Sequence, residues 1–362
     1  MTVRVGLELT VLELDAGGTA RAARGLADAL LLREDVEVVA LRQGGRVRGR
    51  VARGLVRELA WLPFGLPARA RRAGLDVLHC PGPNVPLRPG RVPLVVTVHD
   101  DVSWAHPEWM GRANVLQHRL VLERALPRAA AVITPSAFAR DKVLSRLELD
   151  PARVHVVPWG VDARFGPGPE PEPPDGPREG GLPYLLAVGT LQPRKNLEAA
   201  LAAFERAVDA GLEHRLVVVG ARGWRDAALL ARVGGSRHAQ RIRLAGFVAD
   251  DELAALYREA DALLFPSRYE GFGLPALEAM ASGTPVVAAR AGALPEVIGE
   301  AGVLVDPDDP DALATALLEL LADADRQARL RAAGLRRAEG FTWAACAEPT
   351  VAARLTRFST CR

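Results

Sequence analysis

Residues 267–285 of the chain are SRYEGFGLPALEAMASGTP. They follow an apolar run at 262–265, and the pattern predicts a strand, a glycine-bearing loop and a helix with Pro275 in its first turn. The first turn of a helix presents backbone amides, and glycines without a Cβ let a ligand approach the backbone. Residues 271–274 are therefore typical of a site for a phosphate or another anion.

Two glutamates frame this anion site. Glu270 precedes the loop, and Glu278 lies inside the predicted helix. An ionised carboxylate only accepts hydrogen bonds, which suits the hydroxyl groups of a sugar and of a ribose. We therefore expect both side chains to face one cleft at different depths along a single ligand.

A second motif supplies positive charge. VGTLQPRKN at residues 188–196 places Arg194 and Lys195 between a strand that ends at Gly189 and a helix of apolar period. Two cations there can neutralise a diphosphate. Only Lys142 and Lys195 of the 46 basic residues are lysines, which favours a need for a compact ammonium at position 195.

The rest of the chain predicts an α/β protein with doubly wound parallel sheets, because short β-rich apolar runs alternate with segments of helical period. In the first half we expect strands at 3–9, 36–41, 77–79, 94–99, 131–134 and 154–157, and helices at 20–32 and 114–126. In the second half we expect strands at 184–189, 215–220, 242–245, 262–265, 285–288 and 302–305, and helices at 196–210, 251–259, 274–282 and 310–322.

A length of 362 residues favours two domains. We expect Rossmann-like domains at 1–165 and 184–340, joined by a linker at 166–183 that is too rich in Pro, Gly and charge for a helix or strand. A final helix within 341–362 is expected to pack back on the first domain. Open parallel sheets bind ligands beyond the carboxyl ends of their strands, so we expect the site in a cleft between the domains.

Composition indicates an ordinary globular protein, with 49% hydrophobic and 25% charged residues. The three cysteines lie far apart and lack the paired spacing of a zinc or redox site. No apolar run approaches the roughly 20 residues of a membrane-spanning helix, and the first residues lack the pattern of a secretory signal. These features predict a cytoplasmic protein.

Positive charge is concentrated in the first half of the chain. Residues 1–165 hold 24 Arg and Lys against 17 Asp and Glu, and much of the excess lies between Arg42 and Arg72, around the apolar WLPFGL at 61–66. Basic residues around exposed aromatics are typical of peripheral contact with an anionic membrane, here the inner face, or with a lipid-phosphate acceptor. The alternative is a solvated amphipathic helix. No nucleic-acid motif accompanies the charge, so we expect no nucleic-acid partner.

Two further loops of the first domain end at candidate site residues. VVTVHDD at 95–101 places His99 at the carboxyl end of a strand, where it is either a general base or a histidine satisfied by its own loop. GGTAR at 17–21 places Gly18 in a glycine-rich turn before a helix.

We expect no metal site. DPDDPD at 306–311 has the D-x-D spacing of metal-dependent transferases, but it follows a strand and leads into a helix. We therefore interpret Asp309 as a helix cap with Pro310 in the first turn. No G-x-G-x-x-G follows the first strand, which argues against a nicotinamide dehydrogenase.

Over nearly its whole length the chain resembles the retaining glycosyltransferases of family 4. The E-x7-E pair within EGFGLPALEAMASGTPVVA at 270–288 carries this resemblance, together with VGTLQPRKN. It implies the GT-B fold, in which two Rossmann-like domains face each other across a cleft, with the acceptor on the side of the first and the nucleotide sugar on the second.

The resemblance also implies residue roles. Glu270 contacts the transferred sugar, Arg194 and Lys195 bind the donor diphosphate, and Glu278 holds the ribose, while His99 is supported as a catalytic-site residue. The other residues that it places near the donor are Gly18, Gly189, Phe247, Val248, Gly271, Phe272, Gly273 and Leu274. The chain departs from the family at Trp159, where relatives usually have Asn, and after Gly18, where many have an aromatic residue.

These roles predict a metal-independent, retaining transfer of a hexose to a hydroxyl of a glycan or lipid-linked acceptor, in polysaccharide or glycolipid synthesis. The motifs look most like those of mannosyltransferases, so a GDP-mannose type donor is favoured over UDP or dTDP sugars. Two alternatives stay open: a non-catalytic subunit that binds nucleotide sugars, and a nucleotide-sugar epimerase or phosphorylase of the same fold.

Overall fold

The computed structural model describes residues 2–14, 17–43, 50–88, 90–168, 182–223 and 226–355. The chain divides into two compact units: unit 1 comprises Met1–Gly160 and Trp343–Arg362, and unit 2 comprises Val161–Thr342. Most of the predicted linker, residues 169–181, lies outside the described residues.

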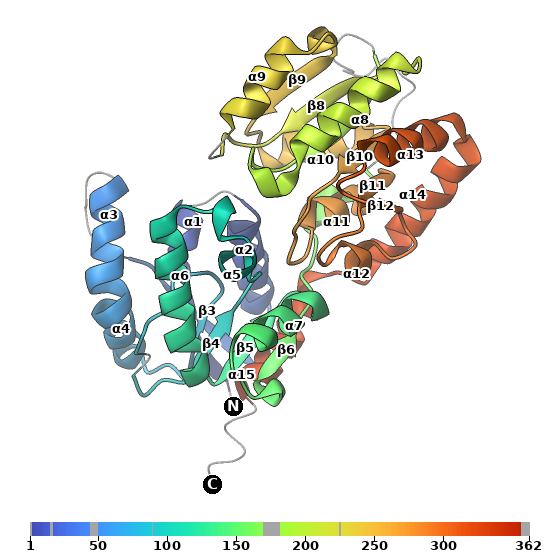
Figure 1. Ribbon diagram of the computed structural model, residues 1–362. Helices are drawn as coiled ribbons and strands as arrows, with labels where there is room; N and C mark the ends of the chain where they lie inside the picture. Colours follow the sequence, from blue (N-terminus) through green and yellow to red (C-terminus); the bar gives the residue numbers. More distant parts are fainter. Residues whose placement is uncertain are drawn as a thin grey trace. The chain divides into compact units, whose positions relative to one another are not determined.

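Unit 1 is built on a six-stranded parallel sheet in the order β2-β1-β3-β4-β5-β6 (Figure 1). Its central strands are buried on both faces, which explains why they read as continuous apolar runs. The strands are β1 (Val3–Glu8), β2 (Val36–Leu41), β3 (Val77–Cys80), β4 (Leu94–Thr97), β5 (Ala131–Thr134) and β6 (Val154–Val156).

Helices cover both faces of this sheet. The apolar side chains of η1, α4, α6 and α7 form one core with alternate strand residues, whereas α2 and α15 meet Thr97 and Ile133 on the opposite face. The helices of unit 1 are α1 (Val11–Leu14), α2 (Gly18–Leu31), α3 (Arg50–Val56), η1 (Arg57–Gly65), α4 (Leu66–Arg72), α5 (Val102–Ala105), α6 (Arg112–Ala125), α7 (Ala137–Arg146) and α15 (Trp343–Leu355), with short 3-10 turns at η2 (Pro107–Trp109), η3 (Leu126–Arg128) and η4 (Pro151–Arg153).

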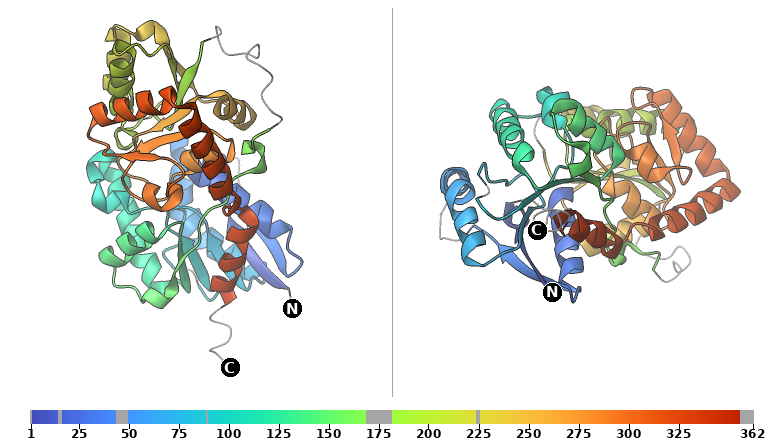
Figure 2. Two further views of the ribbon diagram at one scale, coloured as in Figure 1. Left: turned by 90° about the vertical axis from the view of Figure 1, so that its right-hand side faces the viewer. Right: turned by 90° about the horizontal axis from the view of Figure 1, so that it is seen from below.

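The C-terminal helix α15 lies alongside α2, at the other end of the sequence (Figure 2). The ring of Trp343 fits against Gly25 of α2, where an added Cβ would lie only 2.2 Å from the ring. A glycine in the middle of a helix costs stability relative to alanine, so this close packing explains its presence.

Unit 2 repeats the architecture with a parallel sheet in the order β12-β11-β10-β7-β8-β9. Helices α8, α9 and α13 share one apolar core with the sheet, and α10 and α11 cover the other face, with α14 packed on α11 (Figure 1). The strands are β7 (Tyr184–Val188), β8 (Arg215–Val219), β9 (Ile242–Gly246), β10 (Ala262–Phe265), β11 (Val286–Ala289) and β12 (Val303–Val305). The helices are α8 (Leu197–Asp209), α9 (Ala227–Gly235), α10 (Asp250–Glu259), α11 (Leu274–Ala281), α12 (Leu294–Ile298), α13 (Pro310–Ala322) and α14 (Ala324–Glu339), with 3-10 turns at η5 (Ala163–Phe165), η7 (Pro193–Lys195) and η8 (Ala239–Arg241).

All twelve predicted strands are present, most within one or two residues of their expected bounds. The predicted cap is also confirmed, because the Asp309 carboxylate accepts hydrogen bonds from two amides in the first turn of α13. The sequence interpretation did not include α14, whose apolar stripe is narrow and whose surface is rich in arginine.

Candidate active site

Three charged residues of unit 2 meet beyond the carboxyl ends of β7 and β10. The Lys195 Nζ lies 2.5 Å from the Glu270 Oε1, and an Arg194 NH1 nitrogen lies 3.4 Å from the Glu270 Oε2. Lys195 and Glu270 are both buried, and the Lys195 ammonium also lies 5.2 Å from the centre of the Phe265 ring. The structure therefore brings together the two cations and the first glutamate that the two sequence motifs predicted.

The electrostatics of this cluster keep the carboxyl ionised. Burial alone would raise the pKa of Glu270, but the charges of Lys195 and Arg194 outweigh burial and hold the pKa below its usual range. Removing either charge would leave a buried, poorly compensated partner. The site is thus built around fixed charges.

The loop that carries the cations is anchored to the neighbouring loops. Asn196 adopts the left-handed conformation, with φ of 52°, and its side-chain amide donates hydrogen bonds to the carbonyls of Pro266 and Pro307. Because Gly189 has no side chain, there is room for the aliphatic stem of Lys195, which would lie only 3.1 to 3.3 Å from a Cβ at position 189.

A turn before α12 holds the backbone of Glu270. The Ala293 amide donates to the Glu270 carbonyl at 2.9 Å. Gly292 has φ of +59°, and a Cβ there would lie 2.6 Å from that carbonyl oxygen. Gly273 also has positive φ, 110°, and no side chain caps the helix α11 that follows it.

Glu278 lies in the interior of unit 2 and is only 1% exposed. The Tyr257 hydroxyl donates a 3.0 Å hydrogen bond to its Oε2 atom. Tyr257 packs edge-on against Phe165, so α10 and η5 both help to fix the position of this glutamate. The sequence pattern did not predict Tyr257, because nothing in its spacing distinguishes it from an ordinary core residue.

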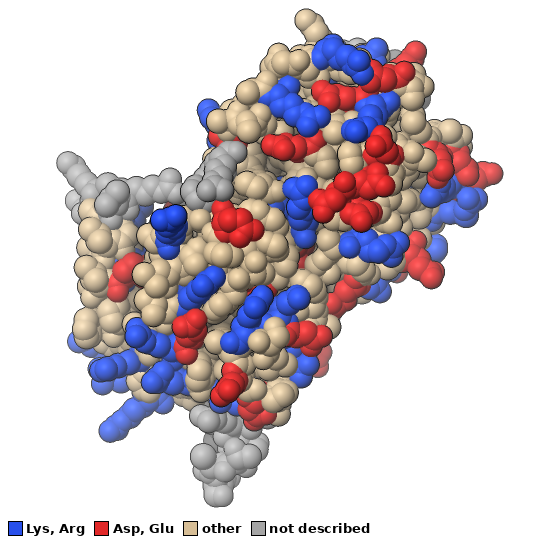
Figure 3. Space-filling view, in the orientation of Figure 1, with Lys and Arg blue, Asp and Glu red and all other residues tan. Residues whose placement is uncertain are grey.

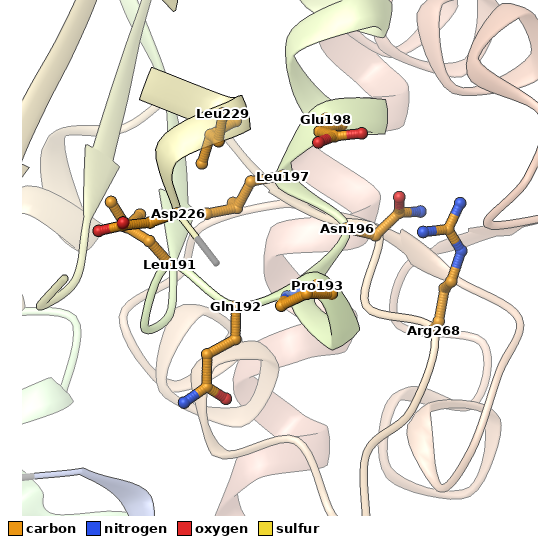
Figure 4. Close-up of a pocket in the computed structure, with 9 residues that line it drawn as sticks. All are labelled: Leu191, Gln192, Pro193, Asn196, Leu197, Glu198, Asp226, Leu229 and Arg268. Atoms are coloured by element: carbon orange, nitrogen blue, oxygen red, sulfur yellow. The ribbon is translucent and has the colours of Figure 1, made fainter. Parts of the chain in front are cut away.

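The remaining predicted donor residues of unit 2 lie on separate loops. Phe247 follows β9 and is 60% exposed, whereas its neighbour Val248 is buried. A hollow of about 90 Å³ lies beside the loop of residues 191–197, between Gln192, Asp226 and Arg268 (Figure 4). Arg194, Lys195 and Glu270 do not line this hollow, so it is separate from the charged cluster.

In unit 1 the two predicted site residues differ in exposure: His99 is half-buried and Gly18 is exposed. A ring nitrogen of His99, Nε2, lies 2.9 Å from the Pro81 carbonyl, and the ring packs edge-on against Trp159 at 4.8 Å. The hydrogen-bond partner lies in the loop after β3 and not in the histidine's own loop, and the ring contact involves the tryptophan at which the chain departs from the family. Gly18 is the first residue of α2 and lies beside Thr19, which lines a larger cavity.

A buried carboxyl in unit 1 was not predicted. Glu8 at the end of β1 accepts hydrogen bonds from the Thr10 hydroxyl, the Trp61 indole and the Asn84 amide. Burial is the dominant effect and raises the pKa of Glu8, although these hydrogen bonds oppose it. In the sequence Glu8 looks like a solvent-facing residue of an alternating strand.

The described residues contain no group of three or more His, Cys, Asp and Glu that could hold a metal ion. Within the same ranges, no helix has the length and hydropathy needed to cross a membrane.

Comparison with known proteins identifies the family. The model described as "Glycosyltransferase Family 4" matches residues 16–165, and the model described as "Glycosyl transferases group 1" matches residues 182–323. O-antigen chain mannosyltransferase B of Escherichia coli is 33% identical over 275 residues, which are 75% of this chain and 72% of that protein. The chain belongs to the group 1 and family 4 glycosyltransferases.

Solved structures show the same fold. Sucrose-phosphate synthase from Thermosynechococcus elongatus matches with a TM-score of 0.79 and 22% identity over 99% of this chain and 100% of the other. An Anabaena protein in complex with UDP and glucose matches with a TM-score of 0.74 and 18% identity over 98% and 100% of the two chains. The predicted GT-B fold is confirmed, and the chain is a glycosyltransferase of this type.

Proposed function

We propose that the protein is a retaining, metal-independent hexosyltransferase whose donor is a nucleotide diphosphate sugar of the GDP-mannose type. The Arg194–Lys195–Glu270 cluster carries this proposal. Arg194 and Lys195 stabilise the diphosphate that leaves, as two fixed positive charges do for a developing anion. Glu270 accepts hydrogen bonds from the sugar, and the amides of residues 271–274 face the phosphate side of the donor.

Other residues complete the donor site in this proposal. Glu278 holds the ribose, Phe247 stacks on the base, and Val248 contacts it through the backbone. The exposed ring of Phe247 supports this role, because an exposed aromatic ring is available for stacking. Gly18 and His99 contribute from unit 1. The mannose preference rests on the motifs and on the Escherichia coli relative, which is a mannosyltransferase.

The ion pairs of Glu270 support retention of configuration. An inverting transfer needs a general base and a covalent intermediate needs a nucleophile, and the charges of Lys195 and Arg194 make Glu270 a poor candidate for either role. We therefore propose attack by the acceptor hydroxyl on the face from which the diphosphate departs, assisted by the two cations.

The test is product analysis by NMR after incubation of the full chain with GDP-mannose or UDP-glucose and a panel of glycoside and lipid-linked acceptors. An axial product linkage from the axial donor supports retention. An inverted product, or turnover abolished by a chelator and restored by a divalent ion, contradicts the mechanism. Free epimer, or sugar phosphate formed with inorganic phosphate, would instead identify the epimerase or phosphorylase alternative.

We further propose that α3, η1 and α4 contact an anionic membrane. Pro63 cannot donate a backbone hydrogen bond, and the wide turn of η1 closes with the Leu66 amide bonded to the Trp61 carbonyl.

The segment α3–η1–α4 leaves apolar side chains exposed, with Leu59 at 69% and Phe64 at 70%. Exposed arginines accompany them at positions 53, 69, 71 and 72, and Figure 3 shows Lys and Arg gathered near α4 at the lower left. Residues 44–49 of the predicted basic segment lie outside the described residues.

Vesicle co-sedimentation tests this contact. We expect the wild type to pellet with vesicles containing phosphatidylglycerol, and Leu59→Glu with Phe64→Glu to release it, while Leu32→Glu, just after α2, serves as an exposed control. Equal recovery with neutral and anionic vesicles would contradict the proposal.

A further inference from the structure

Unit 1 contains a cavity of about 330 Å³ that the proposed donor site does not use. It lies beyond the carboxyl ends of the sheet, between α1, α2, η1, α6 and the loop after β3. Its volume falls at the lower end of the range of about 300 to 1,000 Å³ typical of small-molecule sites. Ligands of open parallel sheets bind at this edge.

The polar groups that line the cavity carry no net charge. Arg57 and Glu58 form an ion pair at 2.8 Å, so their charges cancel. His118 bonds to the Ser103 hydroxyl through Nδ1, and burial lowers its pKa, which favours the neutral ring at pH 7.

Neutral side chains supply the other polar groups. Thr19, Asn84, Asn114 and Gln117 line the cavity, and Asn114 and Gln117 are exposed to a ligand from solvent. Amides both donate and accept hydrogen bonds, as sugar hydroxyls do. The apolar side chains of Val11 and Val121 can pack against the C–H surface of a pyranose ring.

A buried hydrogen bond fixes the side of the cavity that Asn84 forms. Asn84 is buried, and its Nδ2 donates to the Glu8 Oε2 at 3.3 Å. The same carboxyl accepts from the Trp61 indole of η1. Donation to this carboxyl fixes the orientation of the Asn84 amide, so this amide is set before a ligand arrives.

We propose that this cavity binds an uncharged saccharide, the glycosyl end of the acceptor, through Asn84, Asn114 and Gln117. The inference rests on the proposed transferase function and adds the class of acceptor to it. A phosphate group fits the cavity poorly, because Arg57 is already paired with Glu58 and His118 is neutral. A lipid-linked acceptor would then place its sugar, and not its phosphate, in this cavity.

The test measures binding of soluble probes to the full chain by saturation-transfer NMR. The neutral probes are the methyl α-glycosides of mannose, glucose and galactose, and the charged probe is mannose 1-phosphate. The variant is Asn114→Ala with Gln117→Ala, and the control is Leu116→Ala, a residue of the same helix that is 61% exposed and does not line the cavity. Thermal stabilisation by GDP and UDP is recorded on every preparation as a separate readout of the donor site.

We expect a neutral glycoside to bind the wild type and the control equally and the double variant about tenfold more weakly, with the nucleotide shift unchanged in all three. Unchanged binding to the double variant, tighter binding of mannose 1-phosphate than of any glycoside, or no glycoside binding to the wild type would each overturn the inference. If nucleotides fail to stabilise the wild type while glycoside binding is lost in the double variant, the proposed donor function fails and the saccharide site stands.

Discussion

Glu270 of unit 2 and Glu8 of unit 1 are both buried near the carboxyl ends of parallel strands, yet their surroundings differ in charge. Glu270 pairs with Lys195 and Arg194, whereas Glu8 accepts hydrogen bonds from a hydroxyl, an indole and an amide. Burial opposes ionisation at both sites. The two cations reverse that effect and lower the pKa of Glu270, and the neutral donors leave the pKa of Glu8 raised.

The comparison shows how one residue type serves two kinds of site. A cluster of fixed charges is suited to a charged ligand, because a diphosphate can take over the interactions of the two cations. A neutral network is suited to holding a wall of amides for a neutral ligand.

The largest expected effect comes from removing each carboxyl charge in turn. Glu270→Gln leaves Lys195 and Arg194 without their partner and should destabilise the protein by about 3 kcal/mol. Glu8→Gln removes a charge that has no cation and should be neutral or stabilising by up to about 1 kcal/mol. Urea denaturation at pH 7 measures both, and equal destabilisation by the two variants would remove the contrast.

The two carboxyl variants are also expected to differ in how their stability depends on pH. The pKa of folded Glu270 is below its usual 4.5, so its stabilising contribution is present above that value and is lost as the pH falls through the folded pKa. The gap between wild type and Glu270→Gln should therefore close in acid. The pKa of folded Glu8 is above 4.5, so its contribution is full below that value and is lost as the pH rises through the folded pKa.

Any advantage of Glu8→Gln over the wild type should thus grow with rising pH and then level off. Denaturation curves at several pH values between about 2 and 8 measure both gaps. If the stability difference from the wild type changed with pH in the same way for both variants, the assigned pKa directions would be contradicted.

A smaller effect is expected at the turn that holds Glu270. Gly292→Ala should cost about 2 kcal/mol, because the methyl group meets the Glu270 backbone and the φ is positive. Gly246→Ala is a matched control with φ of +71° and no atom within 4 Å, so it should show only the backbone strain, about 1 kcal/mol. If the two variants unfold at the same denaturant concentration, the contact between a methyl group at position 292 and the Glu270 backbone has no effect on stability.

The smallest effect tests the neutral network. Trp61→Phe removes one of the hydrogen bonds to Glu8 and should cost about 1 kcal/mol in the wild-type background. A double-mutant cycle with Glu8→Leu, which removes the acceptor, isolates the contribution of this hydrogen bond. Additive effects would show that Trp61 stabilises unit 1 by packing alone.

Much of the fold follows from local patterns in the sequence. The apolar runs predicted the twelve strands because both sheets are parallel and their central strands are buried on both faces. The motifs also predicted that Arg194, Lys195 and Glu270 belong to one site. Glu8, Asn84 and Tyr257 could not be predicted, because their roles depend on contacts between residues far apart in the chain, such as the 76 positions that separate Asn84 from Glu8.

The most direct test of the donor site compares the two lysines of the chain. Thermal stabilisation by GDP, UDP and their mannose and glucose derivatives is measured for the wild type, Lys195→Ala and Lys142→Ala; Lys142 lies over the Phe138 ring of unit 1 and serves as the control. We predict that the wild type and Lys142→Ala bind a guanine nucleotide equally, and that Lys195→Ala binds it at least about tenfold more weakly. Equal binding by all three proteins, or no stabilisation of the wild type by any nucleotide, would contradict the assignment of the Arg194–Lys195–Glu270 cluster as the donor site.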